Sequence, residues 1–255
     1  MNYELKGLVH HDTKLSDIVI AEPTALTVLN RFGIYLGLGD LTVARACDKL
    51  GIDKDFLATI LNTYLHESYF PERILASFRA ATIVDYLGQT NNYYAQFQLP
   101  NIERHFNLLI SKSDPSNNNL ELMLRFFLEV KQQLLARIAD DSNHWFPAIL
   151  QAETKAAGSP PTPLKGEYPV LNTHCTFPLQ VGLGGQNRIK EPEDTIEDKL
   201  GDLISMMVIH LQGDHDWNLA LAVLMALANL KKDITQNNRI RNRLLRPIYQ
   251  ALSNA

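Results

Sequence analysis

The segment Leu227–Ile248, LANLKKDITQNNRIRNRLLRPI, carries the most informative pattern in the chain. Large apolar side chains recur three or four residues apart, which is the spacing that places them on one face of an α-helix. The repeat reads Leu227, Leu230, Ile234, Asn237, Arg241, Leu244 and Ile248. Because its spacing never breaks, it predicts a core-facing helix with an amide and a guanidinium where leucine is expected.

Three further segments show the same apolar repeat with polar interruptions. The first contains Val84, Leu87, Asn91 and Tyr94. The second contains Phe127, Val130, Leu134, Arg137 and Asp141. The third has Glu193 ahead of Ile196, Leu200, Leu203 and Met207. Together with the last segment they predict an all-α protein built on a four-helix bundle.

The six polar interruptions are expected to form one buried network. They are Asn91, Arg137, Asp141, Glu193, Asn237 and Arg241. Buried charges are costly unless they are paired and hydrogen-bonded. Four of the six are charged, two of each sign, so we expect two ion pairs whose leftover donors and acceptors are satisfied by the two asparagines. The alternative is that the helices bend and these side chains extend to solvent.

The chain divides into two expected domains. Residues 12–66 are expected to form a small helical domain, in which Thr42 and Asp53 precede apolar repeats and are expected to cap helices. Residues 76–255 are expected to form the bundle, with a long crossover at 151–192 that is rich in glycine and proline. A connection of that length is unusual inside a compact domain.

Composition limits the classes of function. The net charge of −4 argues against a dedicated nucleic-acid surface, which usually carries a basic excess. The two cysteines form no CxxC motif, so the sequence offers no zinc ribbon, and so few cysteines fit a reducing cytoplasm. No stretch approaches the ~18 apolar residues that a membrane helix needs. We therefore expect a cytoplasmic protein that does not bind a membrane. The sequence leaves open whether the protein forms a homo-oligomer.

Two of these segments, the one with Arg137 and Asp141 and the one with Asn237 and Arg241, resemble the ligand helices of hemerythrin-type di-iron proteins. The segment 134–147, LLARIADDSNHWFP, is similar to the pattern H-x-x-x-E-E-x-x-x-F-P, with Arg137 at the His position and Asp141 at the Glu position. The segment 236–247, QNNRIRNRLLRP, resembles the last ligand helix, with Asn237 for His and Arg241 for Glu.

The other two segments extend this resemblance. The segment 90–100, TNNYYAQFQLP, resembles the first ligand helix, in which a His pair is usual. Glu193 falls where the third helix of the family would supply its His.

The N-terminal region strengthens the resemblance. Residues 15–47, from LSDIV at 15–19 through RFGIYLGLGDLTVARAC at 31–47, resemble the N-terminal domain of the iron–sulfur cluster repair proteins, which pair that domain with a hemerythrin-like bundle. In that family a Cys-Cys pair follows Phe-Gly-Ile, whereas this chain has Leu36-Gly37-Leu38 nearby. The resemblance implies a di-iron cofactor. The matched positions instead offer amides, carboxylates and fixed cations that would repel iron, so we expect no metal and no other cofactor.

Three functional hypotheses follow. The first is a metal-free pseudo-hemerythrin that is not an enzyme and that binds a protein or small-molecule partner, in a regulatory pathway linked to iron or nitrosative stress. The second is an iron–sulfur cluster repair protein with an altered iron site, built from carboxylates and shifted histidines such as His105. The third is a binding module that uses the 151–192 crossover as a lid or docking segment.

Overall fold

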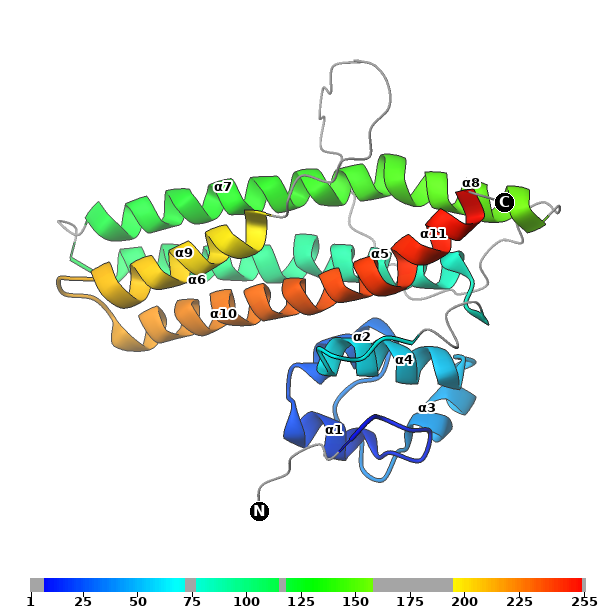
Figure 1. The fold of residues 1–255 in the computed structure, drawn as a ribbon. Coiled ribbons are helices and arrows are strands. Elements are labelled where there is room, and N and C mark those ends of the chain that lie inside the picture. The colour runs from blue at the N-terminus through cyan, green and yellow to red at the C-terminus, as the bar shows by residue number, and fades with distance from the viewer. Residues whose placement is uncertain (1–6, 72–76, 115–117, 158–194, 254–255) are drawn as a thin grey trace, which may run out of the picture.

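The protein is all-helical, as the apolar repeats predict. The computed structural model describes residues 7–71, 77–114, 118–157 and 195–253 (Figure 1). Within these residues the only extended pairing is an isolated antiparallel bridge between Lys14 and Thr42. The remaining order comes from helices and the turns between them.

Four short helices form the N-terminal unit. They are α1 (Leu15–Ala21), α2 (Ala25–Arg31), α3 (Val43–Leu50) and α4 (Lys54–Leu65). The Thr42 side chain accepts a hydrogen bond from the Arg45 amide, and the Asp53 side chain accepts one from the Phe56 amide. Both caps are therefore confirmed, because each side chain satisfies an amide that the first helical turn leaves unpaired.

The rest of the described chain forms four long helical rods. The first is α5 (Ala80–Tyr93), η2 (Tyr94–Gln98) and α6 (Leu99–Ser111). The second is α7 (Asn118–Asp140), η3 (Asp141–Trp145) and α8 (Phe146–Ala157). The third is α9 (Thr195–His210). The fourth is α10 (Trp217–Ile240), η4 (Arg241–Leu245) and α11 (Arg246–Ser253).

The rods pack side by side around a shared apolar core. Helix α6 contacts α7 and α10, and α9 contacts the same two helices from the other side. The core between them is fully buried and includes Phe106, Phe127, Leu203 and Leu227. This is the arrangement that apolar faces at helical spacing favour, because each face is removed from water by two neighbours.

The N-terminal unit packs against one end of the rods. Helix α4 contacts α10, and α2 contacts α5, so the four short helices lie under the rods in Figure 1. A second apolar cluster spans this contact, with Leu29 and Ile60 from the short helices and Ile83 and Leu244 from the rods. The N-terminal unit therefore shares a core with the rods.

One expected boundary is corrected. Helix α8 continues to Ala157, so helix occupies the first residues of the segment expected as a crossover from residue 151. The sequence there, QAETKAA, consists mostly of good helix formers, which explains the extension. The remainder of the expected crossover, 158–192, lies outside the described residues.

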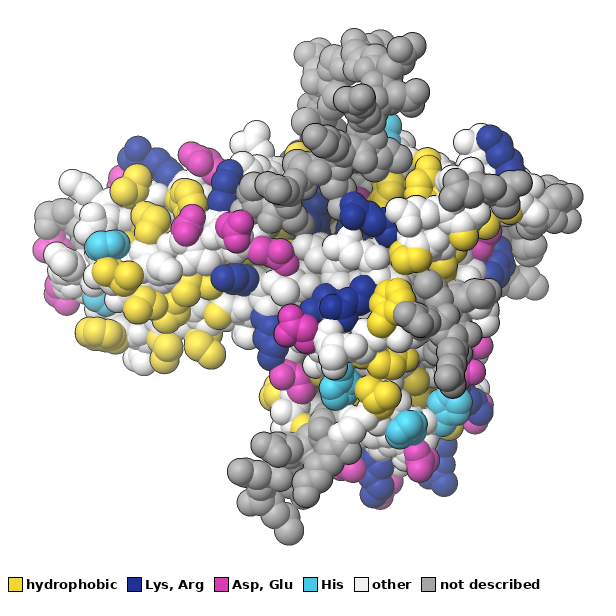
Figure 2. Space-filling view, in the orientation of Figure 1, with side chains coloured by type: hydrophobic (Ala, Val, Ile, Leu, Met, Phe, Trp, Pro, Cys, Tyr) yellow, Lys and Arg dark blue, Asp and Glu magenta, His cyan; other side chains and the backbone are white. Residues whose placement is uncertain are grey.

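Large apolar side chains are exposed along α9 and α10. They are Val208, Ile209, Trp217, Leu221 and Met225, each with more than half of its surface accessible. Figure 2 shows apolar side chains gathered over the end of the rods that these helices form. Among the described helices, none combines the length and the apolarity needed to cross a membrane.

Candidate functional site

A layer of buried polar side chains separates the two apolar clusters. Its members, called the polar layer below, are Arg31, Asn91, Asp141, Asp233, Asn237 and Arg241, and none has more than 7% of its surface exposed. Along α10 and η4, Ile234 belongs to one cluster and Ile240 to the other. The polar layer therefore lies in the interior, where its charges must be paired within the protein.

Asp141 and Arg241 form an ion pair between two rods. Arg241 Nη1 lies 2.6 Å from Asp141 Oδ2, and Arg241 Nη2 lies 2.8 Å from Asp141 Oδ1. Asn91 Nδ2 donates a further hydrogen bond of 2.9 Å to Oδ2. The Arg241 guanidinium carbon lies 4.4 Å from the centroid of the Trp145 ring, in cation–π range. Both carboxylate oxygens of Asp141 are thus bound to nitrogen donors.

A second buried ion pair joins the N-terminal unit to α10. Arg31 Nη2 on α2 lies 2.5 Å from Asp233 Oδ2. The other oxygen of Asp233 accepts hydrogen bonds from Tyr64 (2.8 Å), Thr27 (3.2 Å) and Asn237 (3.2 Å). Side chains from α2, α4 and α10 therefore converge on one carboxylate, which fixes the N-terminal unit against the rods.

Tyrosine hydroxyls complete the polar layer around Asn237. Tyr86 donates to Asn237 Oδ1 over 3.0 Å, and Asn237 Nδ2 donates to the Tyr94 hydroxyl over 3.1 Å. The centroids of the Tyr86 and Tyr94 rings lie 5.8 and 5.7 Å from the Arg31 guanidinium carbon, so both rings contact this cation.

The tyrosines and the buried arginine keep their ordinary protonation states. Burial raises the pKa of Tyr64 and of Tyr94, and the negative charge of Asp233 raises both further. Burial alone would lower the pKa of Arg31, but Asp233 and the tyrosines more than offset it and hold the pKa well above its ordinary value. Neutral hydroxyls and a charged guanidinium are therefore the stable forms in the polar layer.

Each of three rods widens into a short π-helix at this level. The segments η2, η3 and η4 begin at Tyr94, Asp141 and Arg241, and each precedes a proline: Pro100, Pro147 and Pro247. A proline has no amide proton and its ring collides with the carbonyl four residues earlier. The helix accommodates it by forming i→i−5 bonds, such as Phe146 N–H to the Asp141 carbonyl. Segments of this kind are frequent at functional sites.

The structure brings together four of the six residues expected in the buried network. Asn91, Asp141 and Arg241 form one hydrogen-bonded group, and Asn237 bonds to Asp233 in the other. The fifth, Arg137, has intermediate exposure and lies outside the polar layer. The sixth, Glu193, lies outside the described residues.

The position of Arg137 corrects the expected network. Arg137 is more exposed than Asn91, Asp141, Asn237 and Arg241. It occupies the same place in the repeat of α7 that Asn237 occupies in the repeat of α10, yet Asn237 is buried. The spacing of the repeat therefore does not explain the difference in exposure between the two.

Arg31 and Asp233 are the main participants that sequence reasoning missed. Asp233 lies four residues before Asn237 and fits the same apolar repeat, so the periodicity contained a signal for it. Arg31 lies three residues after Val28 on a short apolar helix, which is a much weaker signal. Their partnership depends on how two distant segments dock, and no periodicity encodes that contact.

Metal-ligating side chains do not gather in the described part of the chain. Among those residues there is no group of three or more His, Cys, Asp and Glu side chains placed to hold a metal ion. His105 on α6 has a buried Nδ1 to which no described residue is hydrogen-bonded. The carboxylates of the polar layer, Asp141 and Asp233, are bound by guanidinium groups instead.

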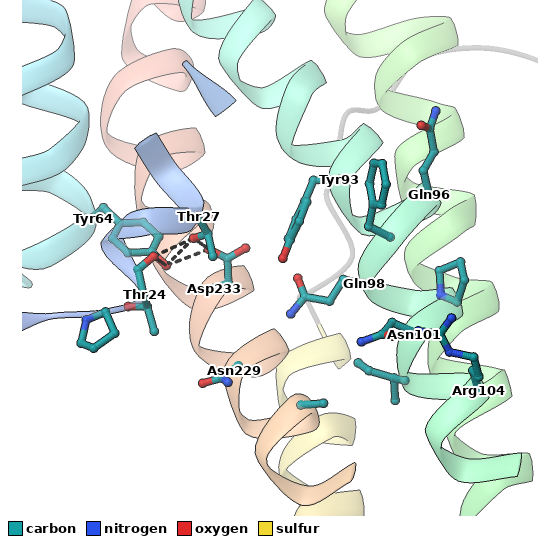
Figure 3. A pocket seen from close by; sticks show the side chains of 15 residues that line it. Thr24, Thr27, Tyr64, Tyr93, Gln96, Gln98, Asn101, Arg104, Asn229 and Asp233 are labelled. Carbon is teal, nitrogen blue, oxygen red and sulfur yellow. Dashed lines mark hydrogen bonds between the residues drawn. The ribbon is translucent and has the colours of Figure 1, made fainter. Parts of the chain in front are cut away.

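A groove of about 730 Å³ opens beside the polar layer, between the N-terminal unit and the rods. Its inner end is formed by Asp233 and Tyr64, and its rod side by Tyr93, Gln98 and Asn229. Figure 3 shows the Tyr93 hydroxyl and the Gln98 carboxamide pointing into the space in front of Asp233. The volume lies within the ~300–1,000 Å³ that small-molecule sites usually occupy.

Comparison with known proteins identifies no relative: no protein-family model, no curated protein sequence and no solved structure matches this chain.

Proposed function

We propose that the protein is a hemerythrin-like four-helix bundle that carries no di-iron centre and acts as a binding or regulatory protein in a pathway linked to iron or nitrosative stress. The observation that carries the proposal is the ion pair between Asp141 and Arg241, since the family resemblance puts metal ligands at these two positions. Each oxygen of Asp141 already accepts a hydrogen bond from the guanidinium.

The chemistry of the polar layer does not fit a di-iron centre. Such a centre needs several imidazoles together with bridging carboxylates. The layer contains no histidine, and it contains two guanidinium groups, which are fixed cations. Arg241 thus supplies positive charge beside Asp141 where the family would use iron.

Metal analysis tests the proposal. Protein purified from cells grown with added iron is expected to contain far less than one iron per chain, because no carboxylate of the polar layer is free to bind it. Protein that retains two irons per chain after desalting would overturn the proposal.

One observation favours a second candidate, an iron–sulfur cluster repair protein with an altered iron site. The buried Nδ1 of His105 has no hydrogen-bond partner in the described part of the chain, and an imidazole nitrogen is a common metal ligand. This candidate predicts that Fe(II) raises the melting temperature of the protein and that His105→Ala abolishes the rise. The metal-free proposal predicts the same melting temperature with and without Fe(II).

A further inference from the structure

We propose that the groove beside the polar layer binds a neutral, hydroxyl-rich small molecule of mono- or disaccharide size. The inference deepens the proposed function and rests on it, because it names the ligand class of a binding protein. It stands on the paired charge at the inner end of the groove, an unsatisfied acceptor on its lining and its aromatic wall.

The inner end of the groove carries no uncompensated charge. Asp233 is paired with Arg31 behind it, and its outer oxygen accepts hydrogen bonds from Tyr64 and Thr27. An ionic ligand that entered here would lose its hydration without meeting a free counter-charge, which is costly. The inner end therefore favours a neutral group, and Arg104, an exposed arginine that also lines the groove, lies away from Asp233 (Figure 3).

The rod side of the groove offers neutral hydrogen-bonding groups. Gln98 Oε1 is buried and has no hydrogen-bond partner among the described residues. Figure 3 shows the Gln98 carboxamide and the Tyr93 hydroxyl close together at the centre of the groove, with Asn229 across from them on α10. An unmet buried acceptor needs a donor, and carboxamides and hydroxyls both donate and accept. A ligand hydroxyl reaches Gln98 Oε1 when the carboxamide turns this buried atom towards the groove, and a hydroxyl-bearing ligand then offers partners to Gln98, Tyr93 and Asn229.

An aromatic wall stands beside these groups. Tyr93 and Phe97 are stacked with ring centroids 6.3 Å apart and ring planes 27° apart, and half of the Phe97 surface is exposed. Aromatic side chains supply flat apolar area next to a polar edge. A saccharide has matching chemistry, since its ring presents an apolar C–H face bordered by hydroxyls.

Isothermal titration calorimetry of the full chain tests this inference. The probes are glucose, galactose, mannose, trehalose, maltose, sucrose and myo-inositol, with adenosine as a neutral heterocyclic probe and citrate as an anionic one. At least one of the seven polyols is expected to bind saturably, with adenosine and citrate giving no saturable heat.

Variants locate the binding. Gln98→Leu removes the unmet acceptor and is expected to weaken polyol binding about tenfold, and Tyr93→Phe, which keeps the ring, is expected to weaken it by a similar factor. Gln132→Leu makes the same exchange at an exposed position on α7 and is expected to bind like the parent protein. Circular dichroism confirms that each variant is folded.

Three results would overturn the inference: no saturable binding of any polyol, binding of adenosine or citrate in their place, or equal affinities for Gln98→Leu and Gln132→Leu. These results leave the proposed function standing if the protein is free of iron. Two irons bound per chain would instead overturn the proposed function, whether or not a polyol binds.

Discussion

Asp141 holds its negative charge in the interior because three nitrogen donors surround it, two from Arg241 and one from Asn91. Asp141→Ala would remove the carboxylate that accepts hydrogen bonds from both terminal nitrogens of the buried Arg241 guanidinium. Removing one partner of a buried ion pair usually costs about 3–5 kcal/mol. We expect urea unfolding to show a loss of that order in the free energy of unfolding.

The neighbouring residue supplies a matched control. Asp140 is mostly exposed and bonds to His144 one turn later, so Asp140→Ala is expected to cost less than about 1 kcal/mol. Equal losses for the two variants would show that the pair with Arg241 does not form in solution.

Cys47 is expected to be an unreactive thiol. Burial, together with the charges of Asp53 and Asp48, raises the pKa of Cys47 to about 11. The thiol stays protonated at about pH 8, and the thiolate is the reactive form. In a Cys175→Ser variant, we expect Ellman's reagent to label the folded protein far more slowly than the protein unfolded in guanidinium chloride. Equally fast labelling of both would contradict the burial of Cys47.

Among the helices, the contact between α2 and α10 depends on the ion pair of Arg31 with Asp233. Arg31→Met keeps the apolar stem but leaves the Asp233 carboxylate buried without a counter-charge, and the expected loss is again about 3–5 kcal/mol. Arg45→Met removes an exposed arginine from α3 and should change stability by less than about 0.5 kcal/mol. Thermal or urea unfolding measures the loss of stability in each variant. Similar losses for the two variants would contradict the role of the Arg31–Asp233 ion pair in docking α2 against α10.

The inner faces of the rods were predictable because periodicity reports burial directly. Leu230, Ile234 and Asn237 follow the helical repeat and all three are buried. Arg137 has the same spacing on α7 but intermediate exposure, so the repeat alone does not determine which of its polar members is buried.

The π-segments and the groove were not predictable from periodicity. A proline within a helical repeat usually indicates a break or a kink. The helices instead accommodate Pro100, Pro147 and Pro247 by an extra residue in the turn before each of them. The groove depends on how the N-terminal unit meets the rods. Gln98 and Tyr64 come together there although they belong to different parts of the chain.

Across the whole molecule, Glu22 at the end of α1 links the N-terminal unit to Lys232 on α10. Partial burial alone would raise the pKa of Glu22, but hydrogen bonds from Lys232 and Thr24 outweigh it and hold the pKa below its ordinary value of 4.5. A lowered pKa contributes stability above the ordinary value, and this contribution disappears as the pH falls through the folded-state pKa.

Glu22→Gln is therefore expected to lower the free energy of unfolding by about 0.5 kcal/mol near about pH 7, and by progressively less towards about pH 3. Glu129→Gln, an exposed exchange on α7, controls for the change in net charge. Chemical unfolding across this pH range measures both variants. A loss for Glu22→Gln that is independent of pH would contradict the assignment.

The bundle as a whole is organised around a guanidinium–carboxylate pair in the interior, at the place where the family resemblance expects iron. The decisive experiment is a crystal structure of protein grown and crystallised with Fe(II), with diffraction recorded above and below the iron absorption edge. We expect Arg241 bonded to Asp141 and no anomalous peak between the rods. Two anomalous peaks beside Asp141, with Arg241 displaced from the interior, would contradict this organisation.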